Sequence, residues 1–127
     1  MPAKTILQTE KAPGAIGPYS QGIRCGEFVF VSGQLPIDPE TGEFVDGGIA
    51  NKTKRAMDNV GAVLETEGLT YKNLMKVTIY TTQMDQFQEI NEAYSWYFVG
   101  APPARAVVGV SSLPKGASIE ISAIAMC

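Results

Sequence analysis

The sequence predicts an α+β fold, a mixed β-sheet with two helices packed on one face. Two segments space their apolar residues as amphipathic helices do, and several short segments alternate or run apolar as strands do. The length of 127 residues suits one domain and leaves no room for a second core. We therefore expect a single domain over residues 1–127, ordered as two or three strands, a helix, a strand, a helix and two strands.

The N-terminal third predicts three strands. KTILQT (4–9) is typical of a short strand, and the proline- and glycine-rich segment 10–20 is typical of a loop. The segments SQGIRC and EFVFVSG flank Gly26 and predict a hairpin. Gly33, at the end of this hairpin, indicates close backbone approach. The EFVFV strand is apolar on both faces, so we expect self-association to cover the face that the helices leave open.

The middle of the chain predicts a helix and then a strand. Apolar residues at helical spacing run from Ile49 to about Glu67, and Gly68 supplies a stop. The alternating segment 74–82 predicts a half-buried strand, with one face formed by Met75, Val77 and Ile79.

A second helix is predicted after this strand. We expect Asp85 to cap it and Gly100 to end it, because Pro102 and Pro103 prevent its continuation. Its apolar stripe comprises Phe87, Ile90, Tyr94 and Tyr97.

The last two predicted strands, 105–112 and 117–126, are joined by the turn sequence LPKG. If they pair as a hairpin, Arg105 and Glu120 project from the same face, about 13 Å apart along the strands. A small molecule then fits between the two side chains, or a neighbouring subunit brings a second copy of one of them closer. This geometry depends on the assumed register.

Composition excludes several function classes. The chain has no histidine, so a histidine-dependent catalytic triad is impossible and a zinc site is not expected. A formal net charge of −3 without a basic stripe disfavours nucleic acid as the partner. Cys25 and Cys127 show no CxxC spacing. Because we find neither a signal-peptide core nor an apolar run of membrane-spanning length, we expect a cytoplasmic protein.

Arg105 and Glu120 are the strongest candidates for chemistry, although each also has an ordinary structural explanation. Arg105 lies at the start of an apolar strand. It either forms an ion pair with Glu120 or donates two parallel hydrogen bonds to a ligand carboxylate. Glu120 either faces solvent or holds and deprotonates a water molecule. Taken singly, Tyr19, Ser32 and Asn91 are adequately explained as a loop tyrosine, a strand-end serine and a helix-flank asparagine.

Three separated blocks carry a family resemblance: GPYSQG, FVFVSGQLPIDPETGEFV and APPARAVVGVSSLPKGASIEISAIA. Together they resemble the signature blocks of the RidA (YjgF-type) reactive intermediate deaminase family. The resemblance implies a chorismate-mutase-like fold and a homotrimer with a barrel-shaped core and three sites between subunits. It also implies hydrolysis of 2-imino acids, such as 2-iminopropanoate and 2-iminobutanoate, to 2-keto acids and ammonia, without cofactor or metal.

The resemblance also implies roles for individual residues. Arg105 matches the arginine that clamps the substrate carboxylate, and Glu120 matches the carboxylate that positions the attacking water. Val107 stands where many relatives have cysteine, which rules out thiol chemistry there and leaves its backbone carbonyl as a contact for the water. The remaining positions expected to contact substrate are Tyr19, Ser32 and Asn91.

Three other function classes stay open at this point, one of them a chaperone-like role through exposed apolar surface. The same pocket could serve a carboxylate-metabolite-binding or regulatory module, because a fold does not fix a function. Glu120 favours an enzyme, since a carboxylate binder gains nothing from a second negative charge. A translation-inhibiting ribonuclease is disfavoured by the acidic balance and the absence of histidine. The expected partners are a small 2-imino acid and further copies of the chain, and neither nucleic acid nor membrane.

Overall fold

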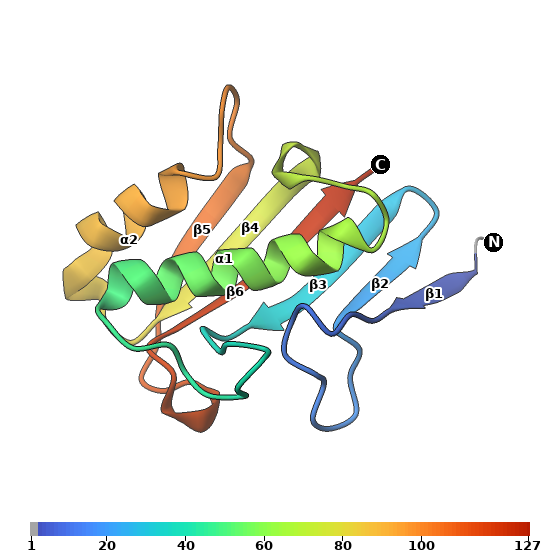
Figure 1. Ribbon diagram of the computed structural model, residues 1–127. Helices are drawn as coiled ribbons and strands as arrows, with labels where there is room; N and C mark the ends of the chain where they lie inside the picture. Colours follow the sequence, from blue (N-terminus) through green and yellow to red (C-terminus); the bar gives the residue numbers. More distant parts are fainter. Residues whose placement is uncertain (1–2) are drawn as a thin grey trace.

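A computed structural model describes residues 3–127; Met1 and Pro2, which the single-domain prediction includes, lie outside the described residues. Within this range the chain forms one six-stranded sheet, and Figure 1 shows α1 and α2 on the same face of it. The predicted α+β architecture is confirmed. Among residues 3–127, neither α-helix combines the length and apolar character that a membrane-spanning segment needs.

The sheet is mixed. Its strand order is β1-β2-β3-β6-β4-β5, and every neighbouring pair is antiparallel except β4 and β5, which run parallel. The crossover from β4 through α2 to β5 produces this parallel pair, as such connections do. The strands are β1 (Lys4–Leu7), β2 (Gly22–Cys25), β3 (Phe28–Gln34), β4 (Leu74–Thr81), β5 (Ala104–Gly109) and β6 (Ile119–Met126).

The predicted hairpin of the last two strands is wrong, because β4 lies between β5 and β6. The LPKG sequence forms a 3₁₀ turn, Pro114–Gly116, within a longer connection that carries the chain past β4. Strand β6 then pairs with both β3 and β4, and its alternate residues Ile119 and Ile121 are fully buried. Burial of these residues on the helix-covered face explains the central position of β6.

The helices follow the predicted segments, with different ends for the second. Helix α1 spans Ile49–Glu65 and α2 spans Phe87–Ser95. Asp85 is not the cap of α2, because it lies in a 3₁₀ turn that precedes the helix. The helix also ends before Gly100: Tyr97 leaves the helix, and its hydroxyl donates to α1 at the carbonyl of Lys54.

The prediction that Met75 shares a face with Val77 and Ile79 is wrong. The pairing of β4 with β6 shifts register between Leu74 and Lys76, so the alternation restarts after Met75. Leu74 is buried, whereas Met75 is 46% exposed. Val77 and Ile79 face the core as predicted.

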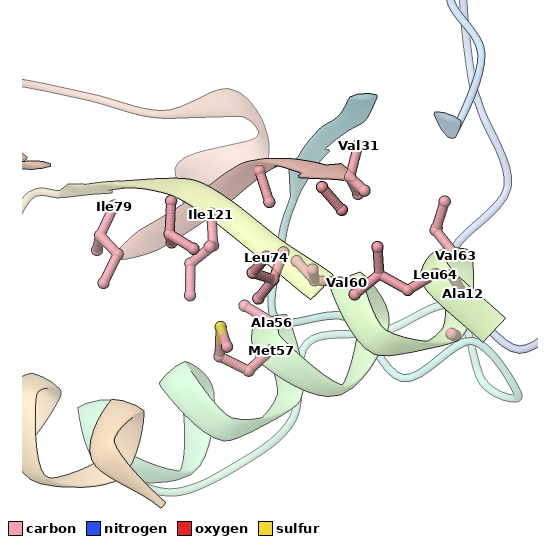
Figure 2. Packing of buried hydrophobic residues seen from close by; sticks show 14 of the residues in the cluster. Ala12, Val31, Ala56, Met57, Val60, Val63, Leu64, Leu74, Ile79 and Ile121 are labelled. Carbon is pink, nitrogen blue, oxygen red and sulfur yellow. The ribbon is translucent and has the colours of Figure 1, made fainter. Parts of the chain in front are cut away.

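The core lies between α1 and the centre of the sheet. Figure 2 shows Met57, Val60 and Leu64 of α1 packed toward Leu74 and Ile121 of the sheet, and all five side chains are buried. Burying an aliphatic side chain of this size contributes about 1.5–3 kcal/mol. This packing holds the strands in a fixed register, on which the position of every candidate site residue depends.

Within residues 3–127 the other face of the sheet carries no helix (Figure 1), and apolar side chains of β1 and β3 are exposed on it. Phe28 and Phe30 of β3 project from it and remain 46% and 43% exposed, whereas Val29 and Val31 point into the core. Ile6 of β1 lies on the same open face and is also exposed. The prediction that β3 is apolar on both faces is therefore confirmed, and one of these two faces is uncovered in a single chain.

A buried asparagine joins α1 to the loop that follows β3. The side chain of Asn59 is fully buried, and its Nδ2 donates to the carbonyl oxygens of Leu35 and Ile37, at 3.0 Å each. Its Oδ1 accepts from Arg55 at 2.8 Å. The loop is thus fixed to the helix by an amide whose donors and acceptor are all used.

Substitution Asn59→Ala is expected to lower the free energy of unfolding by about 2–4 kcal/mol, because two carbonyl groups lose their donor. Urea unfolding at a fixed protein concentration measures this change, and Glu65→Ala at an exposed position of α1, where a surface ion pair with Lys11 is lost, is the control. Equal midpoints for the two variants would show that the loop does not need this connection.

Candidate functional site

A cleft of about 590 Å³ opens beside Glu120, where β3 ends and β6 begins. Tyr19 and Ser32 line it, together with apolar residues of the loop that Asn59 holds. Lys115 also lines the cleft, from a left-handed backbone conformation with φ of 58°. Most non-glycine residues avoid this conformation, which here belongs to the 3₁₀ turn Pro114–Gly116 before β6.

Glu120 lies directly against the backbone of β3. A Cβ atom added at Gly33 would overlap the Glu120 carboxylate, so the carboxylate fits there only because residue 33 is glycine. The close approach predicted for Gly33 is confirmed. Among residues 3–127 no hydrogen-bond donor or cation pairs with this carboxylate, and desolvation by burial raises the pKa of Glu120. An unpaired carboxylate of raised pKa can bind a water molecule and accept its proton.

Tyr19 and Ser32 line the cleft from the segments that precede and form β3. The Ser32 hydroxyl donates to the carbonyl of Ser20 at 2.5 Å, and its backbone N–H donates to the carbonyl of Gln21 at 2.9 Å. These bonds hold the loop that carries Tyr19 against β3. Tyr19 is 51% exposed, and its hydroxyl accepts from the N–H of Ile16 at 3.4 Å. The structure thus brings Tyr19, Ser32 and Glu120 together in one cleft of a single chain.

Arg105 lies in a different pocket, of about 480 Å³, between α2 and β5. Its Nη1 donates to Oδ1 of Asn91 at 2.7 Å. The guanidinium carbon is 5.1 Å from the ring centroid of Tyr94 and 5.8 Å from that of Phe87. No carboxylate within residues 3–127 forms an ion pair with Arg105. The structural alternative, an Arg105–Glu120 ion pair, is therefore excluded within one chain.

The prediction that Arg105 and Glu120 share a face is also wrong. In the parallel pair, Arg105 lies beside Val77, whose side chain is fully buried under the helices. Glu120 lies opposite Tyr80, which alternates onto the other face. The error follows directly from the assumed hairpin. A single chain therefore contains two separate half-sites, the pocket around Arg105 and the cleft beside Glu120.

Val107 lies on β5 beside Ile79, on the same face as Arg105, and packs against the core. Because β5 is an edge strand, one side of its backbone has no neighbouring strand within residues 3–127. Such an edge is able to pair with or contact a second chain. In the same described range no group of three or more His, Cys, Asp or Glu side chains could hold a metal ion.

Sequence reasoning missed the surroundings of Arg105. The sequence predicts Phe87 and Tyr94 only as members of an apolar stripe. In the structure both rings also lie near the guanidinium, and Tyr94 belongs to the buried core as well. Asn91 follows Phe87 by four residues and precedes Tyr94 by three, a spacing that places the three side chains on one side of a helix. This spacing is the sequence signal that could have predicted the group. The contribution of Lys115 to the Glu120 cleft was also missed, because the turn conformation cannot be read from LPKG alone.

Known proteins are similar to this chain over almost its whole length. The family described as Endoribonuclease L-PSP matches residues 9–127. A RutC family protein of Pyrococcus abyssi is 52% identical over 97% of both chains. The human 2-iminobutanoate/2-iminopropanoate deaminase is 42% identical, over 97% of this chain and 90% of that protein. The crystal structure of E. coli TdcF with bound serine has a TM-score of 0.93 and 39% identity, and the match covers 97% of this chain and 98% of that one.

Substitution Gly33→Ala is expected to push the Glu120 carboxylate off β3 toward solvent, which lowers its pKa toward the ordinary glutamate range. Side-chain NMR titration of Glu120 measures the shift. Gly14→Ala is the matched control, because Gly14 lines the same cleft with open space where its Cβ would lie. An unchanged Glu120 titration in Gly33→Ala would contradict the described contact.

Proposed function

The chain belongs to the Endoribonuclease L-PSP family, which includes the RidA proteins, and from that membership we propose that it hydrolyses 2-imino acids to 2-keto acids and ammonia. Relatives named as deaminases for 2-iminobutanoate and 2-iminopropanoate support this substrate class. The observation that carries the proposal is the state of Arg105: it is bound to a neutral amide, faces a pocket and lacks a carboxylate partner within residues 3–127.

Arg105 binds the substrate carboxylate through two parallel N–H···O bonds, which fix the position of C2. Glu120 holds a water molecule, accepts one of its protons, and so directs the oxygen onto C2 of the protonated imine. A new C–O bond forms as the C=N double bond becomes single. Glu120 then returns the proton to nitrogen, the C–N bond breaks, and ammonia leaves. Glu120 accepts the C2 hydroxyl proton as the C=O double bond forms, which yields the 2-keto acid, and passes that proton to the departing ammonia. Positioning supplies much of the rate gain.

The remaining predicted residues support this reaction from around the two groups. Tyr19 and Ser32 shape the cleft in which the water and the imine nitrogen lie, and the backbone carbonyl of Val107 is a further contact for the water. The reaction consumes only water, and protein side chains perform every proton transfer. Neither cofactor nor metal is therefore needed.

The chain assembles as a homotrimer whose sites combine Arg105 of one subunit with Glu120 of the next. Two observations support this assembly. The open face of the sheet exposes Phe28, Phe30 and Ile6, an area that a barrel of three packed sheets would bury. The two half-sites lie on opposite faces, so a single chain cannot bring both to one small molecule.

A binding module remains the second candidate. The E. coli TdcF structure holds serine, which carries a carboxylate, and that observation favours carboxylate binding in a relative. In this chain the Arg105 pocket would then bind a metabolite without turnover. The two candidates differ in whether Glu120 acts on a water molecule.

The deaminase proposal is tested with 2-iminobutanoate generated in situ by a threonine dehydratase. Wild-type protein is expected to accelerate 2-oxobutanoate formation. Arg105→Ala is expected to lower kcat/KM at least about 100-fold, because two charge-assisted hydrogen bonds are lost. Arg24→Ala, which removes an arginine paired with Glu67 outside both pockets, serves as control. If folded wild-type protein gives no acceleration but binds 2-oxobutanoate, the binding module replaces the deaminase.

The inter-subunit site is tested by mixing two inactive variants. Arg105→Ala and Glu120→Gln each lack one half of every site. Refolding them together in equal amounts is expected to restore about a quarter of wild-type activity, because that fraction of subunit pairs joins an intact Arg105 to an intact Glu120. Mixing without refolding is the control. Activity that stays absent in co-refolded trimers would place both groups of each site in one chain.

A further inference from the structure

We propose that three side chains of α2, Phe87, Asn91 and Tyr94, form a cradle that holds the guanidinium of Arg105. Within this cradle Asn91 is the positioning residue: it orients the guanidinium toward a ligand carboxylate without neutralising its charge. The inference rests on the proposed carboxylate-binding role of Arg105. It assigns Asn91 a role beyond lining the pocket: Asn91 acts through Arg105 and not on the substrate.

The cradle comes from one face of a single helix. Phe87, Asn91 and Tyr94 follow the spacing that aligns side chains along a helix, and all three contact Arg105. The amide oxygen fixes one N–H direction, and the two rings lie near the guanidinium carbon, at 5.8 Å and 5.1 Å. Since the aromatic face of a ring attracts a cation, these contacts restrict the long arginine side chain while it keeps its charge.

Every partner of Arg105 in this cradle is uncharged. A guanidinium has five N–H donors, and Asn91 takes one of them, which leaves enough for a bidentate carboxylate. Tyr94 is also neutral, because burial raises its pKa to about 12. Its hydroxyl is buried without a hydrogen-bond partner among residues 3–127, so Tyr94 contributes to the cradle through its ring.

Asparagine at position 91 therefore serves carboxylate binding, as a comparison with aspartate makes clear. An aspartate at position 91 is isosteric, would accept the same hydrogen bond and would pair with Arg105 as a full ion pair. That pair would hold the side chain at least as firmly, but it would compete with a ligand carboxylate for the same cation. Asparagine provides the orientation and leaves the positive charge available.

Three variants test this idea in the full chain, with 2-oxobutanoate as the carboxylate probe in calorimetric titrations and 2-iminobutanoate in turnover. Asn91→Asp is expected to weaken 2-oxobutanoate binding at least about 30-fold and to raise KM similarly, with thermal stability unchanged or higher. Asn91→Ala is expected to weaken binding about 5- to 10-fold, since the Arg105 guanidinium loses its fixed orientation but keeps its charge. Gln88→Glu adds the same charge to an exposed position of α2 and is expected to change binding less than about twofold.

A merely structural hydrogen bond predicts the opposite order. In that case Asn91→Asp keeps the bond and matches wild type, whereas Asn91→Ala is the weaker binder, and this result would overturn the cradle. The outcome is separable from the proposed function. Binding that follows the expected order without any imine turnover would refute the deaminase and support the cradle. Turnover that depends on Arg105 but is unchanged by Asn91→Asp would support the deaminase and refute the cradle. If the wild-type protein shows no binding and no turnover, both proposals are refuted.

Discussion

The parallel pairing of β5 with β4 is the constraint on which the rest of the molecule depends. The crossover through α2 sets Arg105 beside Val77, under the helices, whereas Glu120 alternates onto the opposite face of β6. The same pairing leaves β5 as an edge strand and β6 in the centre of the sheet. The two half-sites of opposite charge therefore lie on opposite faces of the sheet as a consequence of this topology. In the proposed trimer, contact between chains covers the open face of the sheet and joins the half-sites.

Each half-site is held by backbone and neutral groups. Glu120 fits against β3 because Gly33 has no side chain, and its cleft is shaped by a loop that Asn59 fixes to α1. Arg105 is held by an amide oxygen and two aromatic rings. Neither charged group forms an ion pair within the part of the chain that the structure describes. Both therefore remain available to a ligand or a water molecule, at the cost of partial desolvation, which raises the pKa of Glu120.

Much of the fold could be predicted from periodicity and turn residues. The strands around Gly26 and the helix that begins at Ile49 follow from local patterns, and the structure confirms them. The pairing of the last two strands could not be predicted in this way, because a turn-like LPKG is equally compatible with a hairpin and with a longer crossing connection. Register and sheet order are non-local properties. The bulge that exposes Met75 is non-local for the same reason, since it exists only relative to β6.

The candidate residues could be named from the sequence, but their relation to each other could not. Had Arg105 and Glu120 shared a face, their long side chains would have reached toward each other across the roughly 13 Å between their backbones, in a half-buried site where opposite charges attract. The pocket between them would then tend to close into a structural ion pair, which a substrate carboxylate would first have to break. Placing them on opposite faces prevents that collapse within a chain. In the proposed assembly the cation and the carboxylate face one another across a subunit boundary, where the imino acid and its water separate them.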